Sequence, residues 1–305
     1  MEIDFSLVSF VSLLILAACQ PRPAALPASI AQDYIRAVWA RDYVAVYQLL
    51  SAEDRAAQPE KDYVAQHDPF AGGTLALAQH AARSIEFSNI VVGENGDRAT
   101  VVLHVRVPDG NGPELSRILN AETDEASLNA GQIGDLTRQL DDLRAAGKID
   151  FLEGDQTVEL RQRDGKWAVF LNLAQAARVT VEGGVKAGLH WEFAPLVGEV
   201  RLFPGESARI QYRARNLADR AITAKAEEGT SPAQYANALF FAQCFCLFQE
   251  TLQPGQEETL AAVIRLDQDL PAGTTLNVRY DFYPIEAFPA GADTNSPSAA
   301  GTTAP

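Results

Sequence analysis

Some segments in the first half of the chain space their apolar residues at helical intervals. After Ser29 the apolar residues recur every three or four positions, which predicts a helix with Ser29 at its N-cap. Asp42 stands where it would cap a second, shorter helix. A later helix is predicted by an apolar stripe that ends before Gly147, a residue type that terminates helices. The stripe consists of Ile133, Leu136, Leu140 and Leu143.

Other segments of this half alternate apolar and polar residues, as strands do. Residues 85–92 lead into Asn95-Gly96, a dipeptide typical of tight hairpin turns, and residues 100–107 alternate on the far side of it. A second hairpin is predicted around Asp164-Gly165. Helices followed by a meander of strands predict an α+β domain over residues 29–177.

The pattern changes in the last third of the chain to short alternating strands between turns rich in Pro and Gly. Strands are predicted over residues 207–216, 258–266 and 275–282, each with one apolar face. About a hundred residues of this pattern predict an antiparallel β-sandwich over residues 184–285, immunoglobulin-like in size and strand spacing. The predicted fold is therefore an α+β domain followed by an all-β domain.

The two ends of the chain differ from both domains. Residues 5–18 are almost wholly apolar but too few to span a bilayer as a helix, so residues 1–18 are interpreted as a signal peptide. Leu16-Ala17-Ala18-Cys19 resembles a bacterial lipobox, which implies cleavage before Cys19 and attachment of lipid to its thiol. An ordinary signal peptide with a chance cysteine is the alternative. Residues 19–28 form a proline-rich linker, and residues 286–305 are predicted to be a disordered tail.

This signal sets the expected compartment. We expect the chain on the periplasmic face of a bacterial membrane, held there by the lipid anchor, with the choice between inner and outer membrane left open. The net charge of −15 lacks the basic surface that neutralises phosphates, so no nucleic-acid partner is expected. Three cysteines are too few for a disulfide framework, so each needs its own explanation.

The remaining two cysteines form the motif Cys244-Phe245-Cys246. In an extended chain the two thiols share one face with Cα atoms roughly 6.5–7 Å apart, and a disulfide between them would be strained. Thiolates select Cu(I), zinc or iron–sulfur clusters, and a two-sulfur site without a nearby histidine suits Cu(I) better than tetrahedral zinc. Two buried structural thiols, or a redox pair, remain alternatives.

The residues around this motif resemble the cytochrome c oxidase assembly family CtaG/Cox11 from Trp191 to Phe282. The resemblance rests on ordered blocks on both sides of the cysteines. These blocks are Trp191-Glu192-Phe193-Ala194-Pro195, Pro204-Gly205-Glu206, Tyr212-Arg213-Ala214-Arg215-Asn216, Leu252-Gln253-Pro254-Gly255 and Tyr280-Asp281-Phe282.

The resemblance implies a copper chaperone rather than an enzyme. It implies that Cys244 and Cys246 bind Cu(I), with Phe245 and Leu247 supporting the metal motif. The implied partner is subunit I of a haem–copper oxidase, whose CuB site receives the metal, or another copper acceptor. It also implies a homodimer in which two protomers share copper.

Five departures from the family put its standard target in doubt. The chain has the lipid signal at Cys19 in place of the family's transmembrane helix, and it carries an additional domain in front of the sandwich. It lacks the family's third cysteine between the membrane anchor and the sandwich. Leu247 replaces the last aromatic residue of the family's CFCF motif, and Phe241 stands where a lysine is usual.

The α+β domain resembles the NTF2-like cone fold. Some NTF2-like proteins are enzymes, and His67, His80 and His104 are candidate bases, although no acid–base pair has a suggestive spacing. His104 falls on the polar face of its strand, where a surface role is expected. Two further hypotheses therefore stand beside copper delivery. One is a non-metal envelope adaptor that uses the sandwich and the cone as binding modules, and the other is an NTF2-like enzyme.

Overall fold

A computed structural model describes residues 26–119 and 128–287 of the chain. The predicted signal peptide, the predicted lipid-attachment residue Cys19 and almost all of the predicted tail lie outside these ranges, so the structure does not test them. Among the described helices, none is long and apolar enough to cross a membrane.

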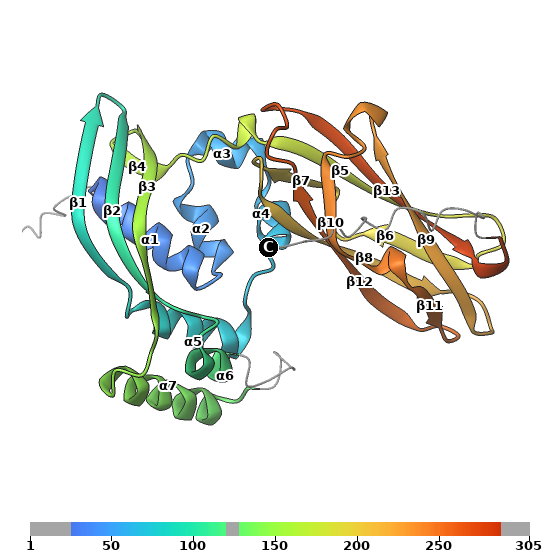
Figure 1. The fold of residues 1–305 in the computed structure, drawn as a ribbon, viewed down its shortest axis with the longest axis horizontal. Helices are drawn as coiled ribbons and strands as arrows, with labels where there is room; N and C mark the ends of the chain where they lie inside the picture. Colours follow the sequence, from blue (N-terminus) through green and yellow to red (C-terminus); the bar gives the residue numbers. More distant parts are fainter. Residues whose placement is uncertain (1–25, 120–127, 288–305) are drawn as a thin grey trace, which may run out of the picture.

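The first part of the chain begins with five helices and continues with a sheet that two more helices interrupt (Figure 1). The helices are α1 (Pro27–Trp39), α2 (Tyr43–Leu49), α3 (Ala52–Ala57), α4 (Glu60–Gln66), α5 (Gly72–Ala82), α6 (Pro113–Leu119) and α7 (Ala130–Ala145). The strands are β1 (Glu86–Asn95), β2 (Arg98–Pro108), β3 (Phe151–Arg163) and β4 (Lys166–Val169), in that spatial order.

Helix boundaries follow local chemistry. Helix α1 starts at Pro27, so the predicted N-cap at Ser29 is wrong, because proline is favoured in the first turn, where no backbone N–H is needed. The Ser29 hydroxyl instead donates to the carbonyl of Leu26. The cap at Asp42 is confirmed, since its carboxylate accepts from the backbone N–H of Ala45. Helix α7 carries the predicted stripe, and Gly147 follows it with a positive φ of 63°.

The sheet of the first part packs one face against the helices. Val101, Leu103 and Val105 on β2 are buried, and the residues between them are more exposed, as their alternation predicts. Both predicted hairpins are confirmed, because β1 pairs with β2 across Gly96 and β3 pairs with β4 across Asp164-Gly165. The α+β class of this part is confirmed, whereas its NTF2-like identity stays a prediction.

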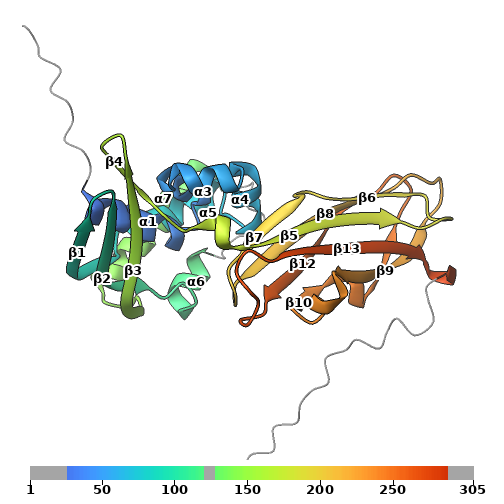
Figure 2. The same cartoon turned by 90° about the horizontal axis from the view of Figure 1, so that it is seen from above.

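The second part consists of two sheets that enclose one apolar core, and we call it the sandwich (Figure 2). One sheet has the order β10-β12-β8-β6 and the other β11-β9-β13-β5-β7. The strands are β5 (Ala177–Val185), β6 (Trp191–Pro195), β7 (Glu199–Leu202), β8 (Ser207–Asn216), β9 (Ile222–Ser231), β10 (Leu239–Cys244), β11 (Gln249–Leu252), β12 (Glu257–Leu266) and β13 (Thr275–Pro284).

The sandwich is not purely antiparallel, which corrects the expectation. Strand β5 runs parallel to β13, with Thr275 opposite Arg178 and Phe282 opposite Val185. It occupies the stretch at which the first domain was expected to end, and its alternating buried residues face the sandwich core. This pairing joins segments about a hundred residues apart along the chain, and a local pattern carries no information about such a partner. The β-rich character of the second part is confirmed, while the immunoglobulin-like label stays a prediction.

Aromatic rings fill the centre of the sandwich. Phe193 stacks on Tyr212 with ring centroids 4.9 Å apart, and it meets Phe282 edge-on at 4.8 Å. Phe245 lies 4.8 Å from Tyr280 and 5.4 Å from Tyr212. These five rings come from both sheets and from the turn after β10, so they tie the cysteine motif to the core.

Helix α4 joins the first part to the sandwich (Figure 1). The side-chain amide of Gln66, which is 3% exposed, pairs with the backbone of Arg201 on the edge strand β7. Its nitrogen donates to the Arg201 carbonyl and its oxygen accepts from the Arg201 N–H, each at 3.0 Å. Gln58 also donates to the same amide oxygen at 2.7 Å. The amide therefore takes the place that a neighbouring strand would occupy.

Candidate metal centre

The two cysteines lie where the chain crosses from one sheet of the sandwich to the other. Cys244 is the last residue of β10 and pairs with Ala262 on β12. Phe245 to Leu247 form a single 3-10 turn, after which β11 begins in the opposite sheet. Because β10 is an edge strand, the crossing lies at one rim of the sandwich.

The structure joins Cys244 and Cys246 in a disulfide, which corrects the expectation that the two thiols stay separate. That expectation assumed an extended chain, but the 3-10 turn brings the two Cα atoms to 5.1 Å. This separation is within the range that disulfides span. The backbone N–H of Cys246 also donates to the Sγ of Cys244 at 3.1 Å. The pair is thus close enough for both sulfurs to act on one atom.

The two sulfurs have different surroundings. Cys244 is 3% exposed, whereas Cys246 is half-buried at the rim. The hydroxyl of Tyr280, from the opposite sheet, lies 3.6 Å from the Sγ of Cys244. Burial, and secondarily the charge of Glu228, raise the pKa of Tyr280, so its hydroxyl keeps its proton.

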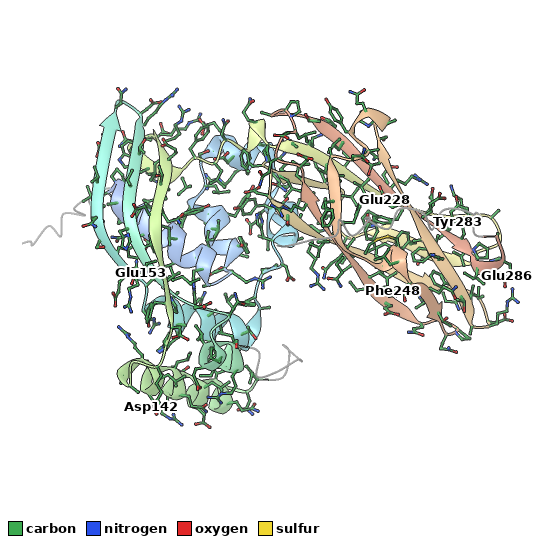
Figure 3. All side chains as sticks on the ribbon, viewed as in Figure 1. Asp142, Glu153, Glu228, Phe248, Tyr283 and Glu286 are labelled. Atoms are coloured by element: carbon green, nitrogen blue, oxygen red, sulfur yellow. A yellow bond between two sulfur atoms is a disulfide. The ribbon has the colours of Figure 1, made fainter. Side chains whose placement is uncertain are left out.

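The hydrophobic residues that flank Cys246 also differ. Phe245 is 6% exposed and packs among the core rings, so its backbone anchors the turn. Leu247 and the following Phe248 are 64% and 65% exposed, and we call these two residues the apolar rim. Figure 3 labels Phe248 on the sandwich, away from the first part of the chain. Phe241, at the position where the family has a lysine, packs edge-on against the ring of Tyr280.

A carboxyl group lies close to this arrangement. Glu228 on β9 pairs with Tyr280 across the strands, so the two side chains leave the sheet on the same face. Burial raises the pKa of Glu228, against a smaller lowering by the Thr230 hydroxyl, which donates to its carboxylate. Figure 3 labels Glu228 on the same part of the molecule as Phe248.

The donor set available to a metal is the pair of sulfurs. Over residues 26–119 and 128–287 no three His, Cys, Asp or Glu side chains are grouped as metal ligands. Structural zinc needs four such donors, whereas Cu(I) accepts a low coordination number and prefers thiolates. The sulfurs of Cys244 and Cys246 therefore fit Cu(I) once the disulfide is reduced.

The three candidate histidines lie in the first part of the chain. His67 stacks on Tyr43 at 4.5 Å, and burial lowers its pKa. His80 and His104 each meet an aspartate at 2.8 Å, Asp141 and Asp155 respectively. These pairs were missed because their partners are 61 and 51 residues away along the chain. The position of His104 on the polar face agrees with the sequence, and hydrogen bonding to Asp155 raises its pKa.

Comparison with known proteins concerns the sandwich and the two strands that precede it, β3 and β4. Residues 152–284 match the family model described as cytochrome c oxidase assembly protein CtaG/Cox11. The protein named cytochrome c oxidase assembly protein CtaG from Sinorhizobium medicae is 37% identical over 122 residues, which are 38% of this chain and 62% of that relative. Its namesake from Rhizobium meliloti is 36% identical over the same length, with the same coverage of each chain.

The extent of these matches is limited. The aligned segment spans about three fifths of the length of these relatives. The match to the family model begins at residue 152, after the helices α1 to α7. Among solved structures, alpha-2-macroglobulin from Escherichia coli aligns with 65% of this chain and 17% of its own, at 10% identity and a TM-score of 0.19. That likeness is too loose to carry an argument.

The resemblance of residues 191–282 to the CtaG/Cox11 family is thus confirmed. The matched range includes all the strands from β5 to β13, the core rings and both cysteines. Residues 152–284 of this chain are a CtaG/Cox11 domain.

Proposed function

We propose that the sandwich binds Cu(I) through Cys244 and Cys246 and passes it to the CuB site of a haem–copper oxidase during cytochrome c oxidase assembly. One observation carries the proposal. The two sulfurs lie within bonding reach of each other at a rim of the sandwich, inside the region that matches CtaG/Cox11. The matched relatives are named for oxidase assembly.

The chemistry follows from the donor set. A dithiol reductant gives two electrons and two protons to the disulfide, which frees the two cysteine thiols and leaves the reductant as its own disulfide. Both cysteine thiols lose their protons when Cu(I) binds. Copper then leaves by ligand exchange, in which donors of an acceptor replace the two thiolates one at a time. No covalent bond of a substrate changes in this transfer, so the protein acts as a chaperone and not as an enzyme.

The surroundings of the pair support contact with an acceptor or with a second copy. The apolar rim is exposed beside Cys246, where a partner must approach to take the metal. A second protomer at this rim would bring two more thiolates to shared copper. We further propose that a lipid on Cys19 holds the chain on the periplasmic face of a membrane, where the cysteines can meet an oxidase subunit.

The test is Cu(I) binding by the reduced full chain without oxygen, in competition with a chromogenic chelator. The matched control carries Cys244→Ser and Cys246→Ser together, which removes both sulfurs. We expect uptake by the parent protein and none by the double variant. Equal uptake by both proteins would exclude the cysteine pair as the site.

A non-metal adaptor is the second candidate, and the exposed apolar rim favours it, because such a surface can contact a partner protein without any metal. In that case the double serine variant would support oxidase assembly in cells as well as the parent protein does. Loss of assembly in that variant, with the protein still folded and present, would leave copper delivery as the function.

A further inference from the structure

The disulfide offers an incoming thiol two sulfurs that differ in access. Thiol–disulfide exchange needs the attacking thiolate, the attacked sulfur and the leaving sulfur nearly in line. Cys244 is 3% exposed and lies at the end of β10, with the core ring of Phe245 next to it. Cys246 is half-buried and precedes the exposed Leu247. An attacking sulfur therefore reaches the Sγ of Cys246 more readily than that of Cys244.

The leaving sulfur also differs in the support it receives. The Sγ of Cys244 accepts from the backbone N–H of Cys246 at 3.1 Å. The hydroxyl of Tyr280 lies 3.6 Å from the same sulfur, and it must be the donor, because a sulfur in a disulfide carries no hydrogen. Tyr280 is fully buried between the sheets, so water does not compete for its hydroxyl.

We propose that the disulfide opens in one direction, with Cys246 attacked and Cys244 leaving as a thiolate that the Tyr280 hydroxyl stabilises. In the first step the thiolate of a small thiol or a protein dithiol forms a new bond to the Sγ of Cys246. The bond between the two cysteines breaks, and its electron pair passes to the Sγ of Cys244.

A second thiolate of the reductant completes the reaction. It attacks the reductant sulfur of the mixed disulfide, which frees Cys246 as a thiolate and leaves the reductant oxidised to its own disulfide. Each cysteine thiolate then takes a proton from water or binds a metal. The proposal concerns the oxidised pair, so it stands whether or not the reduced pair binds copper.

Tyr212 provides a matched control for Tyr280. Both tyrosines are fully buried, their rings lie 5.4 Å apart, and both contact the ring of Phe245. The hydroxyl of Tyr212, however, has no hydrogen-bond partner among the described residues. Replacing either tyrosine by phenylalanine removes one buried hydroxyl and keeps the ring, so only Tyr280→Phe removes a donor to the sulfur.

The experiment reduces the oxidised full chain with excess 2-mercaptoethanol and stops the reaction with acid at early times. Free thiols are then alkylated, and tandem mass spectrometry locates the mixed disulfide and the alkyl group on either side of Phe245. We expect the mercaptoethanol adduct on Cys246 and the alkyl group on Cys244. An adduct on Cys244 would overturn the proposed direction.

The rates give the second readout. We expect Tyr280→Phe to slow the first step about tenfold, the size expected when a sulfur that gains charge loses one hydrogen bond. Tyr212→Phe should react at the parent rate, which separates the hydrogen bond from a general loosening of the core. Equal rates for both variants would overturn the role of Tyr280, provided that their far- and near-ultraviolet circular dichroism matches that of the parent.

Discussion

Replacing Phe245 by alanine removes the ring that anchors the turn between the two cysteines. The side chain is 6% exposed, and its ring centroid lies between 4.8 and 5.9 Å from four other rings. Burial of such a ring contributes about 1.5–3 kcal/mol, and the cavity left after truncation adds to the loss. We therefore expect Phe245→Ala to lower the free energy of unfolding of the sandwich by about 3–5 kcal/mol.

Leu247 is the matched control, because it stands in the same turn on the other side of Cys246. It is 64% exposed, so alanine removes little buried surface there, and we expect a loss below about 1 kcal/mol. Urea unfolding of the oxidised chain measures both values. Trp39 and Trp167 pack in the first part, so both are replaced by phenylalanine in every protein compared. The fluorescence of Trp191, which is buried in the sandwich core, then reports this transition alone.

The two variants together test whether the ring holds the site in place. A loss below about 1 kcal/mol for Phe245→Ala would refute the reasoning, as would an equal loss for Leu247→Ala. With the expected difference, reduced Phe245→Ala should also bind Cu(I) more weakly than the parent, since its cysteines are no longer fixed relative to the core.

Three further changes test other parts of the structure. Gln66→Ala should lower the free energy of unfolding by about 2 kcal/mol and speed hydrogen exchange at the Arg201 amide, because both backbone groups that the amide pairs with lose their partner. Hydrogen bonds from Arg279 are the main cause of the lowered pKa of Asp281. The ionised carboxylate therefore contributes its full stabilisation above the pKa that Asp281 has in the unfolded chain. This contribution is lost as the pH falls through the lower pKa of the folded protein. Asp281→Asn should therefore narrow the difference in Tm between about pH 6 and about pH 3, and an unchanged difference would contradict this. Gly183→Ala should lower the free energy of unfolding by about 1–3 kcal/mol, measured by thermal or urea unfolding, because a Cβ there would lie 2.9 Å from a ring carbon of the phenylalanine in β6. A variant as stable as the parent would show that this ring moves freely.

Elements set by local patterns were predictable from the sequence. Strand β8 spans Ser207–Asn216, the stretch that alternation predicts, and its apolar residues Ile210 and Tyr212 are fully buried. The hairpin at Asn95-Gly96 likewise follows from a turn whose chemistry lies within two residues. In both cases the information is contained in a few consecutive residues.

Features that join distant segments were not predictable in this way. The parallel pairing of β5 with β13 and the contact of Gln66 with Arg201 both depend on the fold as a whole. At the cysteines the missing information was the backbone conformation. Residues after Cys244 turn into a 3-10 helix instead of continuing the strand, because the chain must cross from β10 to a strand of the other sheet. The motif predicted the donor atoms but not the bond between them.

The pairing of Gln66 with β7 also affects how the protein avoids self-association. An unpaired edge strand is a template on which another chain can add a strand, and proteins commonly block such edges. Here the block comes from a side chain of the preceding part of the chain, which is synthesised before β7. Helix α4 and its Gln66 have therefore already been synthesised when β7 emerges. A sandwich separated from helix α4 would expose that edge, so we expect the first part of the chain to serve the second as an intramolecular guard against aggregation.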